Sequence, residues 1–154
     1  GFYLDTSGMT SIHIIVGSVM GTATEVANHL DGELRRLGYP TRLDMRFEPD
    51  HLKMEDTLLI CTSNTGIGDL PANIAPFYDH LVIAQPELSN VKYGLVNLGD
   101  SSYPSFAMAG KTLDDELFAR NATRIGDPCV IDALYGDDPC DLASQWLSKW
   151  VKLL

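Results

Sequence analysis

The segment GSVMGTAT, residues 17–24, places small and hydroxylated residues between an apolar run and an amphipathic stretch. The first amides of a helix lack backbone partners and together carry about half a positive charge. Ser18, Thr22 and Thr24 add hydroxyl donors at this expected helix start. Such a nest binds a phosphate dianion without a cationic side chain. The alternative is a helix start without a ligand, in which Thr22 and Glu25 form a capping box.

Two further loops follow apolar runs in the same way. The segment CTSNTGIGDLP, residues 61–71, contains Gly66 and Gly68, which allow a backbone to approach a flat ligand closely. The segment LGDSSYPSF, residues 98–106, contains Tyr103, whose ring can stack on a planar group while its hydroxyl stays in water. Each loop alone is also compatible with an ordinary turn. Together the three loops provide a phosphate nest, a glycine wall and an aromatic wall.

Apolar runs alternate with amphipathic stretches along the whole chain. Residues 11–17, 57–63 and 92–99 predict buried strands, each directly before one of the three loops. Residues 40–47 alternate as a strand near a sheet edge does, and residues 128–134 predict a short fifth strand. Five strands with helices between them predict an α/β fold, a doubly wound parallel sheet within a three-layer sandwich. Ligands of such sheets bind beyond the carboxyl ends of the strands, where the three loops are expected.

Helical periodicity separates the predicted strands. The first helix is expected from Thr22 to a left-handed end at Gly38, and the second has Pro71 near its first turn. A third helix follows the 98–106 loop, and the last begins with Asp138 as its N-cap. The predicted apolar positions of the four helices are Val26, Leu30, Leu34 and Leu37; Ile74, Phe77, Tyr78 and Leu81; Ala109, Leu113 and Leu117; and Leu142, Trp146, Trp150 and Leu153.

The length of 154 residues fits one domain. The start GFYLDTSG lacks the features of a signal peptide, so we expect residues 1–8 to be a cloning remnant ahead of a native start at Met9, with one domain over 9–154. The apolar runs are far shorter than the ~20 residues that a membrane-spanning helix needs. The chain has three cysteines and no C-x-x-C pair, which favours a reducing, cytoplasmic setting.

The formal net charge is −10, and −9 remains once Asp5 of the expected remnant is set aside. Nucleic acids and anionic membranes bind clustered Lys and Arg, so this acidity argues against both as partners. An acidic surface can serve solubility alone. It can also steer a basic partner, which raises association rates by about 10–10³.

Other nucleotide and metal sites lack their required residues. A dinucleotide-binding fingerprint needs G-x-G-x-x-G, whereas Gly17 and Gly21 are separated by three residues. A P-loop needs Lys followed by Ser or Thr, which this loop lacks. The four histidines form no pair with the spacing of metal ligands, so we expect no metal; they are His13, His29, His51 and His80.

The three loops, in this order, resemble those of the flavodoxin family. GSVMGTATEVANHL resembles the phosphate loop for FMN, while TGIGDLPANIAPFYDHL and LGDSSYPSFAMAGKTLDDEL resemble the second and third flavin loops of the short-chain, MioC-type branch. The likeness runs from about Ile12 to Leu154. Residues 124–133 leave no room for the insertion that splits the fifth strand of long-chain flavodoxins. The resemblance implies a five-stranded sheet of order 2-1-3-4-5 and one non-covalently bound FMN.

The resemblance also implies which residues bind the cofactor. The positions that match the phosphate loop are Ser18, Val19, Met20, Gly21, Thr22 and Ala23. Those that match the second loop are Ser63, Asn64, Thr65, Gly66 and Gly68. Those that match the third are Leu98, Gly99, Asp100, Ser101, Tyr103 and Phe106, with Tyr103 as the stacking ring, and Asp138 matches a more distant acid on the flavin side. No catalytic residue is implied.

Two positions depart from the family pattern. Met20 stands where many members place a threonine whose hydroxyl meets the phosphate, and Thr65 stands where many place an aromatic residue. The first change removes a donor and the second leaves one face of the flavin less covered. We therefore expect weaker retention of FMN.

The function implied is single-electron transfer between partner proteins with basic faces, such as a flavodoxin reductase and an electron-accepting enzyme, by a monomeric carrier. The alternative is an enzyme, an FMN-dependent NAD(P)H or quinone oxidoreductase on the same fold. A third possibility is an interaction domain of this fold that has lost the cofactor.

Overall fold

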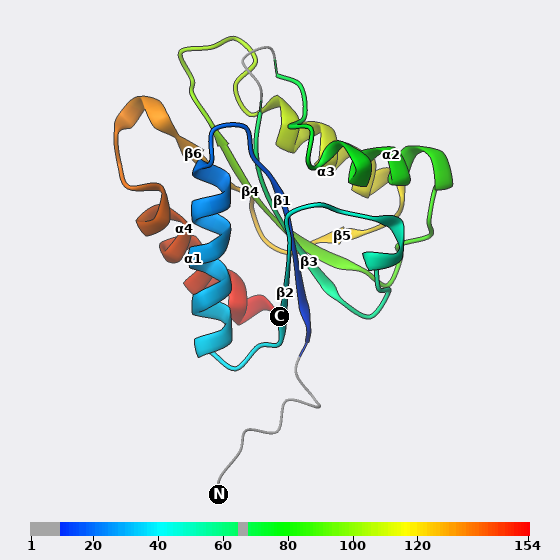
Figure 1. The fold of residues 1–154 in the computed structure, drawn as a ribbon. Helices are drawn as coiled ribbons and strands as arrows, with labels where there is room; N and C mark the ends of the chain where they lie inside the picture. The colour runs from blue at the N-terminus through cyan, green and yellow to red at the C-terminus, as the bar shows by residue number, and fades with distance from the viewer. Residues whose placement is uncertain (1–9, 65–67) are drawn as a thin grey trace, which may run out of the picture.

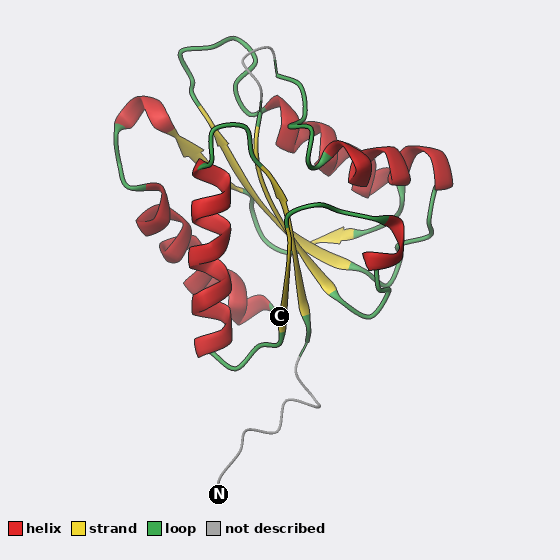
Figure 2. Ribbon diagram, viewed as in Figure 1, coloured by secondary structure: helices red, strands yellow, loops and turns green. Residues whose placement is uncertain are grey.

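The computed structural model describes residues 10–64 and 68–154, which form a parallel sheet between two layers of helices (Figures 1 and 2). The strands are β1 (Ile12–Gly17), β2 (Thr41–Asp44), β3 (Thr57–Ser63), β4 (Lys92–Gly99), β5 (Thr123–Arg124) and β6 (Cys129–Asp132). The sheet order is β2-β1-β3-β4-β5, and β6 also pairs with β4. The predicted fold class and the order 2-1-3-4-5 are confirmed, with the fifth position shared by two short strands.

Each face of the sheet is covered by two helices. The helices are α1 (Thr22–Arg36), α2 (Ala75–Ala84), α3 (Met108–Ala119) and α4 (Pro139–Trp150), with short 3₁₀ turns η1 (Pro49–His51), η2 (Ala133–Tyr135) and η3 (Val151–Leu153). Helices α1 and α4 lie together on one face, and α2 and α3 lie on the other (Figure 1). Within the described residues, no helix is both long enough and apolar enough to pass through a bilayer.

Alternating side chains of the strands feed two separate cores. Ile14 and Val16 of β1 pack on the α1 and α4 side, whereas Ile15 between them packs on the α2 and α3 side. All three side chains are fully buried. Because both faces of a parallel sheet are covered, its central strands are apolar at successive positions. This is why the runs in the sequence predicted β1, β3 and β4 well.

The edge opposite β2 is interrupted between β5 and β6. Two indoles of α4 hold this interruption: Trp150 Nε1 donates to the carbonyl of Ile125 at 3.1 Å, and Trp146 Nε1 donates to that of Asp127 at 2.8 Å. The two rings stack with their centroids 5.3 Å apart. Between β5 and β6, two backbone carbonyls are thus bonded by side chains of α4. The sequence pattern predicted only the second of the two pieces.

Two predicted details of the helices are wrong. Leu37 is 54% exposed, because α1 ends at Arg36, one residue before it. Gly38, which follows Leu37, has a φ of 94° and turns the chain away from the helix, as predicted. Leu153 is 55% exposed, because it lies in η3 beyond the end of α4. Helix α2 also begins only at Ala75, after a turn in which the amide of Ala75 donates to the carbonyl of Pro71. The N-cap at Asp138 is confirmed by a hydrogen bond from the amide of Cys140.

The predicted capping box at the start of α1 is also wrong. The N-cap is Gly21, which has a φ of +92°, and no side chain caps the helix. Thr22 is already the first helical residue, so its hydroxyl is not in the position from which an N-cap accepts. A glycine is suited to this turn because a positive φ costs it little. The Thr22 side chain is thereby left at the exposed surface of the helix start.

Gly94 of β4 should be intolerant of substitution. A Cβ at this position would lie 2.6 Å from the ring of Trp150, whose indole is held by its bond to Ile125. We expect Gly94→Ala to lower the free energy of unfolding by about 1–3 kcal/mol, as overpacking does. Chemical denaturation followed by circular dichroism measures this.

Gly32 is the matched control, since it lies inside α1 with open space around its Cα. Gly32→Ala should raise stability by about 0.5–1 kcal/mol through helix propensity. Equal effects of the two substitutions would contradict the packing of Trp150 against Gly94.

Candidate functional site

A cavity of about 390 Å³ opens at the carboxyl end of the sheet. Its walls come from the loops that follow β1, β3, β4 and β6, which meet at this edge because the strands are parallel. The lining residues are Val19, Met20, Thr22, Ser63, Asn64, Leu98, Gly99, Asp100, Tyr103, Ile131, Ala133 and Pro139. The volume lies in the range of small-molecule sites, which is roughly 300–1,000 Å³.

The first wall is the loop between β1 and α1. Its amides are arranged by local bonds: the amide of Gly21 donates to Ser18 Oγ at 3.0 Å, and the amide of Glu25 donates to the carbonyl of Gly21 at 3.0 Å. Thr22, at the start of α1, borders the cavity. The positive end of the helix dipole therefore faces the cavity. Met20 is 89% exposed at the tip of this loop.

The second wall is the carboxyl end of β3. Ser63 and Asn64 line the cavity, whereas Thr65 and Gly66 lie outside the described residues. Ser63 Oγ is shielded from solvent and has no hydrogen-bond partner among residues 10–64 and 68–154. A buried hydroxyl without a partner is costly, so this atom is ready to bind a polar group of a ligand.

Gly68 is placed differently from the residues that line the cavity. A Cβ there would lie 2.8 Å from Cβ of Ser105, and its φ is +89°. It thus lets the second loop contact the third, and its role toward a flavin stays a prediction.

The third wall is the loop after β4. Tyr103 is 55% exposed and borders the cavity with Gly99 and Asp100. Phe106 packs against Gly99: a Cβ on Gly99 would lie only 2.8 Å from the ring of Phe106. The ring of Phe106 thus supports the loop, whereas the ring of Tyr103 is available to a ligand.

The third wall is tied to the end of β6 by Asp132. Its Oδ1 accepts from the amides of Ser101 and Leu134, both at 3.0 Å. Desolvation raises the pKa of this carboxyl. The hydrogen bonds from Ser101 and Leu134 together lower the pKa by more, so the net pKa is below its usual range. Ser101, predicted as a site residue, is thus bound to Asp132 beside the cavity.

A fourth wall was missed in the sequence analysis. Ile131, Ala133 and Pro139 line the cavity from the segment that runs from β6 to α4. The signal was present, since the loop after any strand of a parallel sheet reaches the same edge, and residues 128–134 were predicted as a strand. Asp138 does not line the cavity; its carboxylate accepts from the amide of Cys140 at 2.8 Å as the cap of α4. Its role toward a flavin stays a prediction.

Comparison with known proteins identifies the family. The family model of flavodoxins matches residues 14–150. The chain belongs to the flavodoxin family. Protein MioC of Escherichia coli (strain K12) is 36% identical over 146 residues, covering 95% of this chain and 99% of that protein. Flavodoxin YqcA of Pectobacterium carotovorum subsp. carotovorum is 34% identical over 148 residues, covering 95% and 98%. The structure of a cysteine-to-serine mutant of flavodoxin from Pseudomonas aeruginosa matches with a TM-score of 0.88 at 30% identity, covering 94% and 99%.

Membership of this family makes the chain an FMN-binding electron-transfer protein. The residues of the cavity suit that cofactor. The start of α1 and the hydroxyls of Thr22 and Ser63 offer donors to a phosphate and a ribityl chain, while Val19, Leu98 and Ile131 offer apolar surface to a ring. The described residues that line the cavity include no Lys or Arg, so backbone amides and the helix dipole provide its positive potential.

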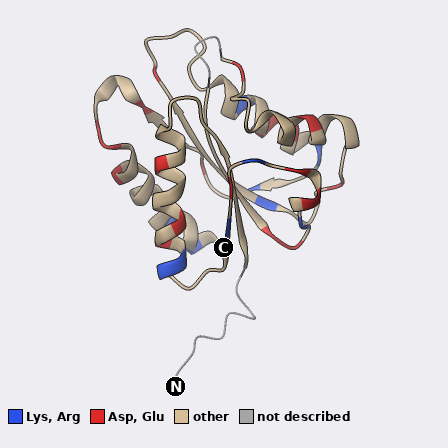
Figure 3. Cartoon of the chain, viewed as in Figure 1, with Lys and Arg blue, Asp and Glu red and all other residues tan. Residues whose placement is uncertain are grey.

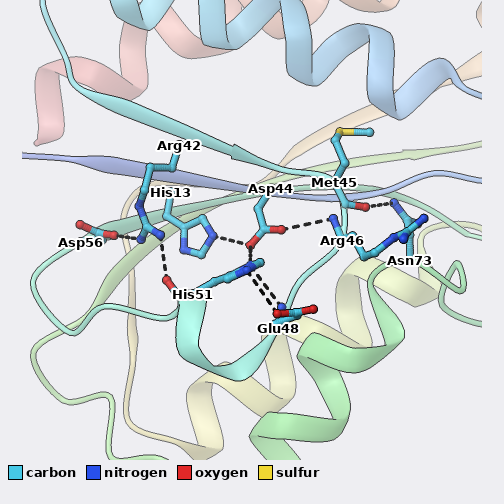
Figure 4. A network of polar contacts seen from close by, with 9 residues as sticks. All are labelled: His13, Arg42, Asp44, Met45, Arg46, Glu48, His51, Asp56 and Asn73. Atoms are coloured by element: carbon cyan, nitrogen blue, oxygen red, sulfur yellow. Dashed lines mark hydrogen bonds and ion pairs between the residues drawn. The ribbon is translucent and has the colours of Figure 1, made fainter.

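A second, smaller cavity of about 200 Å³ lies between β1, β2 and η1. Asp44 is its central group: Asp44 Oδ2 lies 2.8 Å from His13 Nε2 and 2.9 Å from His51 Nδ1 (Figure 4). Arg42 contacts Asp56 and donates to the carbonyl of His51 at 2.9 Å. His13 is fully buried, and burial lowers its pKa more than its hydrogen bond to Asp44 raises it.

Three side chains next to this cavity have the composition of a metal site. Glu48, Asp50 and His51 each offer a ligand atom, and these atoms lie within 4.8 Å of one another. All three belong to η1 or precede it, and the two carboxylates are exposed. Exposed acidic groups gather in this way without an ion as well, so the arrangement does not assign a metal.

The lowered pKa of His13 predicts a pH-dependent stability. The unfolded chain takes up a proton at this histidine near pH 6.5, whereas the folded chain does so only at lower pH. The free energy of unfolding should therefore fall as the pH decreases below about 6.5, until the folded form is also protonated. In His13→Gln this contribution disappears. Urea denaturation at several pH values from 7.5 to 5 measures the two profiles.

His29→Gln is the control, because His29 lies on α1 away from Asp44, and a glutamine can still bond its partners, Glu33 at 3.0 Å and Ser144 at 2.6 Å. Its profile should differ from that of the wild type by less than the profile of His13→Gln does. If His13→Gln also kept the wild-type profile, His13 would not be the group responsible.

Proposed function

We propose that this chain is a carrier of single electrons between partner proteins and not an enzyme with a substrate of its own. The observation that supports this most is the meeting of a helix start and an exposed tyrosine at one cavity. The amides of residues 19, 20 and 22–24 would bind the phosphate of FMN, and Tyr103 would stack on its ring. Bound FMN supplies the reversible uptake of electrons.

The protein side chains have three tasks in this proposal. Thr22 and the start of α1 bind the anion and fix the cofactor in the cavity. Leu98 and Ile131, which are 5% and 2% exposed, keep water from the inner side of the ring. Val19 and Tyr103 are more than half exposed, so the outer edge stays within reach of a docked protein. An exposed edge suits a carrier, whereas an enzyme must enclose a second substrate.

The charge of the chain supports partners with basic faces. Asp100, Asp137 and Asp138 lie on the loops at the cavity edge, and Figure 3 shows further acidic positions along the helices. With a net charge of −10, a basic partner is attracted over a distance set by the ionic strength. A flavodoxin reductase and an electron-accepting enzyme are the partners that this proposal names, with the carrier acting as a monomer.

A visible absorption spectrum after FMN addition and desalting tests the site. We expect a yellow protein that retains one FMN per chain, with flavin fluorescence quenched by Tyr103. The FMN-loaded protein alone should leave NADPH unoxidised, and a flavodoxin reductase should restore electron flow from NADPH. A folded protein that retains no FMN would overturn the proposal. Rapid oxidation of NADPH by the loaded protein alone would favour the enzyme, an NAD(P)H or quinone oxidoreductase.

Met20 provides a test of the phosphate loop. Its side chain cannot donate a hydrogen bond, and it is exposed at the position where the family resemblance implies a hydroxyl that meets the phosphate. We expect Met20→Thr to tighten FMN binding by about tenfold, because a hydrogen bond to a charged group contributes roughly 1.5–3 kcal/mol. Fluorescence titration with FMN measures the affinity.

Met20→Leu is the control for this test, since it changes the shape of the side chain without adding a donor. Its affinity should stay at the wild-type value. A gain in Met20→Leu equal to that in Met20→Thr would mean that shape, and not the hydroxyl, limits binding.

A further inference from the structure

Asn73, which does not line the cavity, joins three separate segments of the chain with its side chain. It lies in the turn before α2. Its Oδ1 accepts from the amide of Ser18 at 2.9 Å, and its Nδ2 donates to the carbonyls of Val16 at 3.0 Å and Met45 at 3.2 Å. These bonds use three of the four that a carboxamide can make. Figure 4 shows Asn73 beside Met45 and Arg46, next to the Asp44 cluster.

Two of the bonds lie on either side of Gly17, the last residue of β1. The carbonyl of Val16 and the amide of Ser18 are both bound by Asn73, so the direction in which the chain leaves the strand is fixed. The neighbouring Ile74 adds a steric limit, because a Cβ on Gly17 would lie 2.6 Å from its Cγ2. The base of the first loop is thus held by residues 73 and 74 from one side.

The third bond connects this base to a rigid part of the molecule. Met45 follows β2, and its neighbour Arg46 donates its amide to Asp44 Oδ1 at 3.2 Å. Asp44 is itself 7% exposed and bound to His13. Asn73 therefore ties the first loop to the chain beside a buried, hydrogen-bonded cluster.

This arrangement determines which amides of the loop face the cavity. The amide of Ser18 is used by Asn73, and the amide of Gly21 is used by Ser18 Oγ. The groups left to an anion are those further along, at residues 19, 20 and 22–24. A loop that holds its donors in place before the ligand arrives loses less conformational entropy on binding.

We propose that Asn73 is a positioning residue that sets the affinity of the site for the phosphate group of its ligand. The inference rests on the proposed FMN site. Asn73 acts on the phosphate through the backbone of Ser18, and within residues 10–64 and 68–154 its hydrogen bonds reach only Val16, Ser18 and Met45. Its loss should weaken binding of a phosphorylated flavin and leave binding of the same flavin without phosphate unchanged.

The experiment compares FMN with riboflavin, which lacks the phosphate, by fluorescence titration of wild type and Asn73→Ala. We expect Asn73→Ala to raise the Kd for FMN by at least about tenfold, since a loop no longer held by three hydrogen bonds must be ordered by the ligand. The Kd for riboflavin should change by less than about twofold, which is about 0.4 kcal/mol, because riboflavin has no phosphate for the first loop to bind.

Tyr93→Phe is the matched control. It removes the hydrogen bond from the Tyr93 hydroxyl to Asp114, at a site between β4 and α3 that has no link to the first loop. It should lower stability while leaving both Kd values unchanged. If Asn73→Ala does not fold, Asn73→Asp replaces it: the carboxylate can still accept from Ser18, but it loses both donated bonds and repels the carbonyls of Val16 and Met45.

The ratio of the two Kd values decides the matter. If Asn73→Ala weakens the binding of FMN and of riboflavin by the same factor, the positioning role of Asn73 is overturned and the FMN site stays in place. The same holds if it weakens the binding of neither. A wild-type protein that binds riboflavin and FMN equally, or binds neither, overturns the proposed phosphate site and this inference together.

Discussion

Everything at the candidate site depends on the parallel pairing of the strands. In a parallel sheet, all strands end at the same edge, so the loops after β1, β3, β4 and β6 meet there although they are far apart in the sequence. The same pairing buries both faces of the sheet and leaves this edge as the place where polar groups can meet a ligand. Helix α1 then adds its unpaired amides at the point where the chain reverses.

The sequence was sufficient for features that follow from local periodicity. The boundaries of β3 and β4 agree with the predicted runs, because their residues are apolar on both faces. The start of α1 was harder, since Thr22 and Glu25 fit a capping box as well as a helix whose N-cap is Gly21. Only the backbone conformation of Gly21 separates these two cases, and a glycine in the sequence permits both.

Features that depend on distant partners could not be read from the sequence. Asn73 binds the amide of Ser18 and the carbonyls of Val16 and Met45, which are 28 to 57 residues away along the chain. These partners are backbone atoms, which every residue has, so the residue types in the sequence do not indicate which ones Asn73 bonds. Ile131 and Ala133 were missed although residues 128–134 were predicted as a strand, because their place in the wall follows from where β6 pairs with β4.

The interruption between β5 and β6 affects how the length of this chain can vary. The carbonyls of Ile125 and Asp127 are already bound by indoles of α4, so this stretch of the edge does not depend on a continuous ladder. The entropy of closing a loop rises only slowly with its length. Extra residues could therefore be accommodated here with little loss to the sheet, as long as β6 keeps its pairing with β4 and Ile131 stays in the cavity wall. The stretch between β5 and β6 is thus a part of the fold where a new surface can be added ahead of the wall that β6 provides.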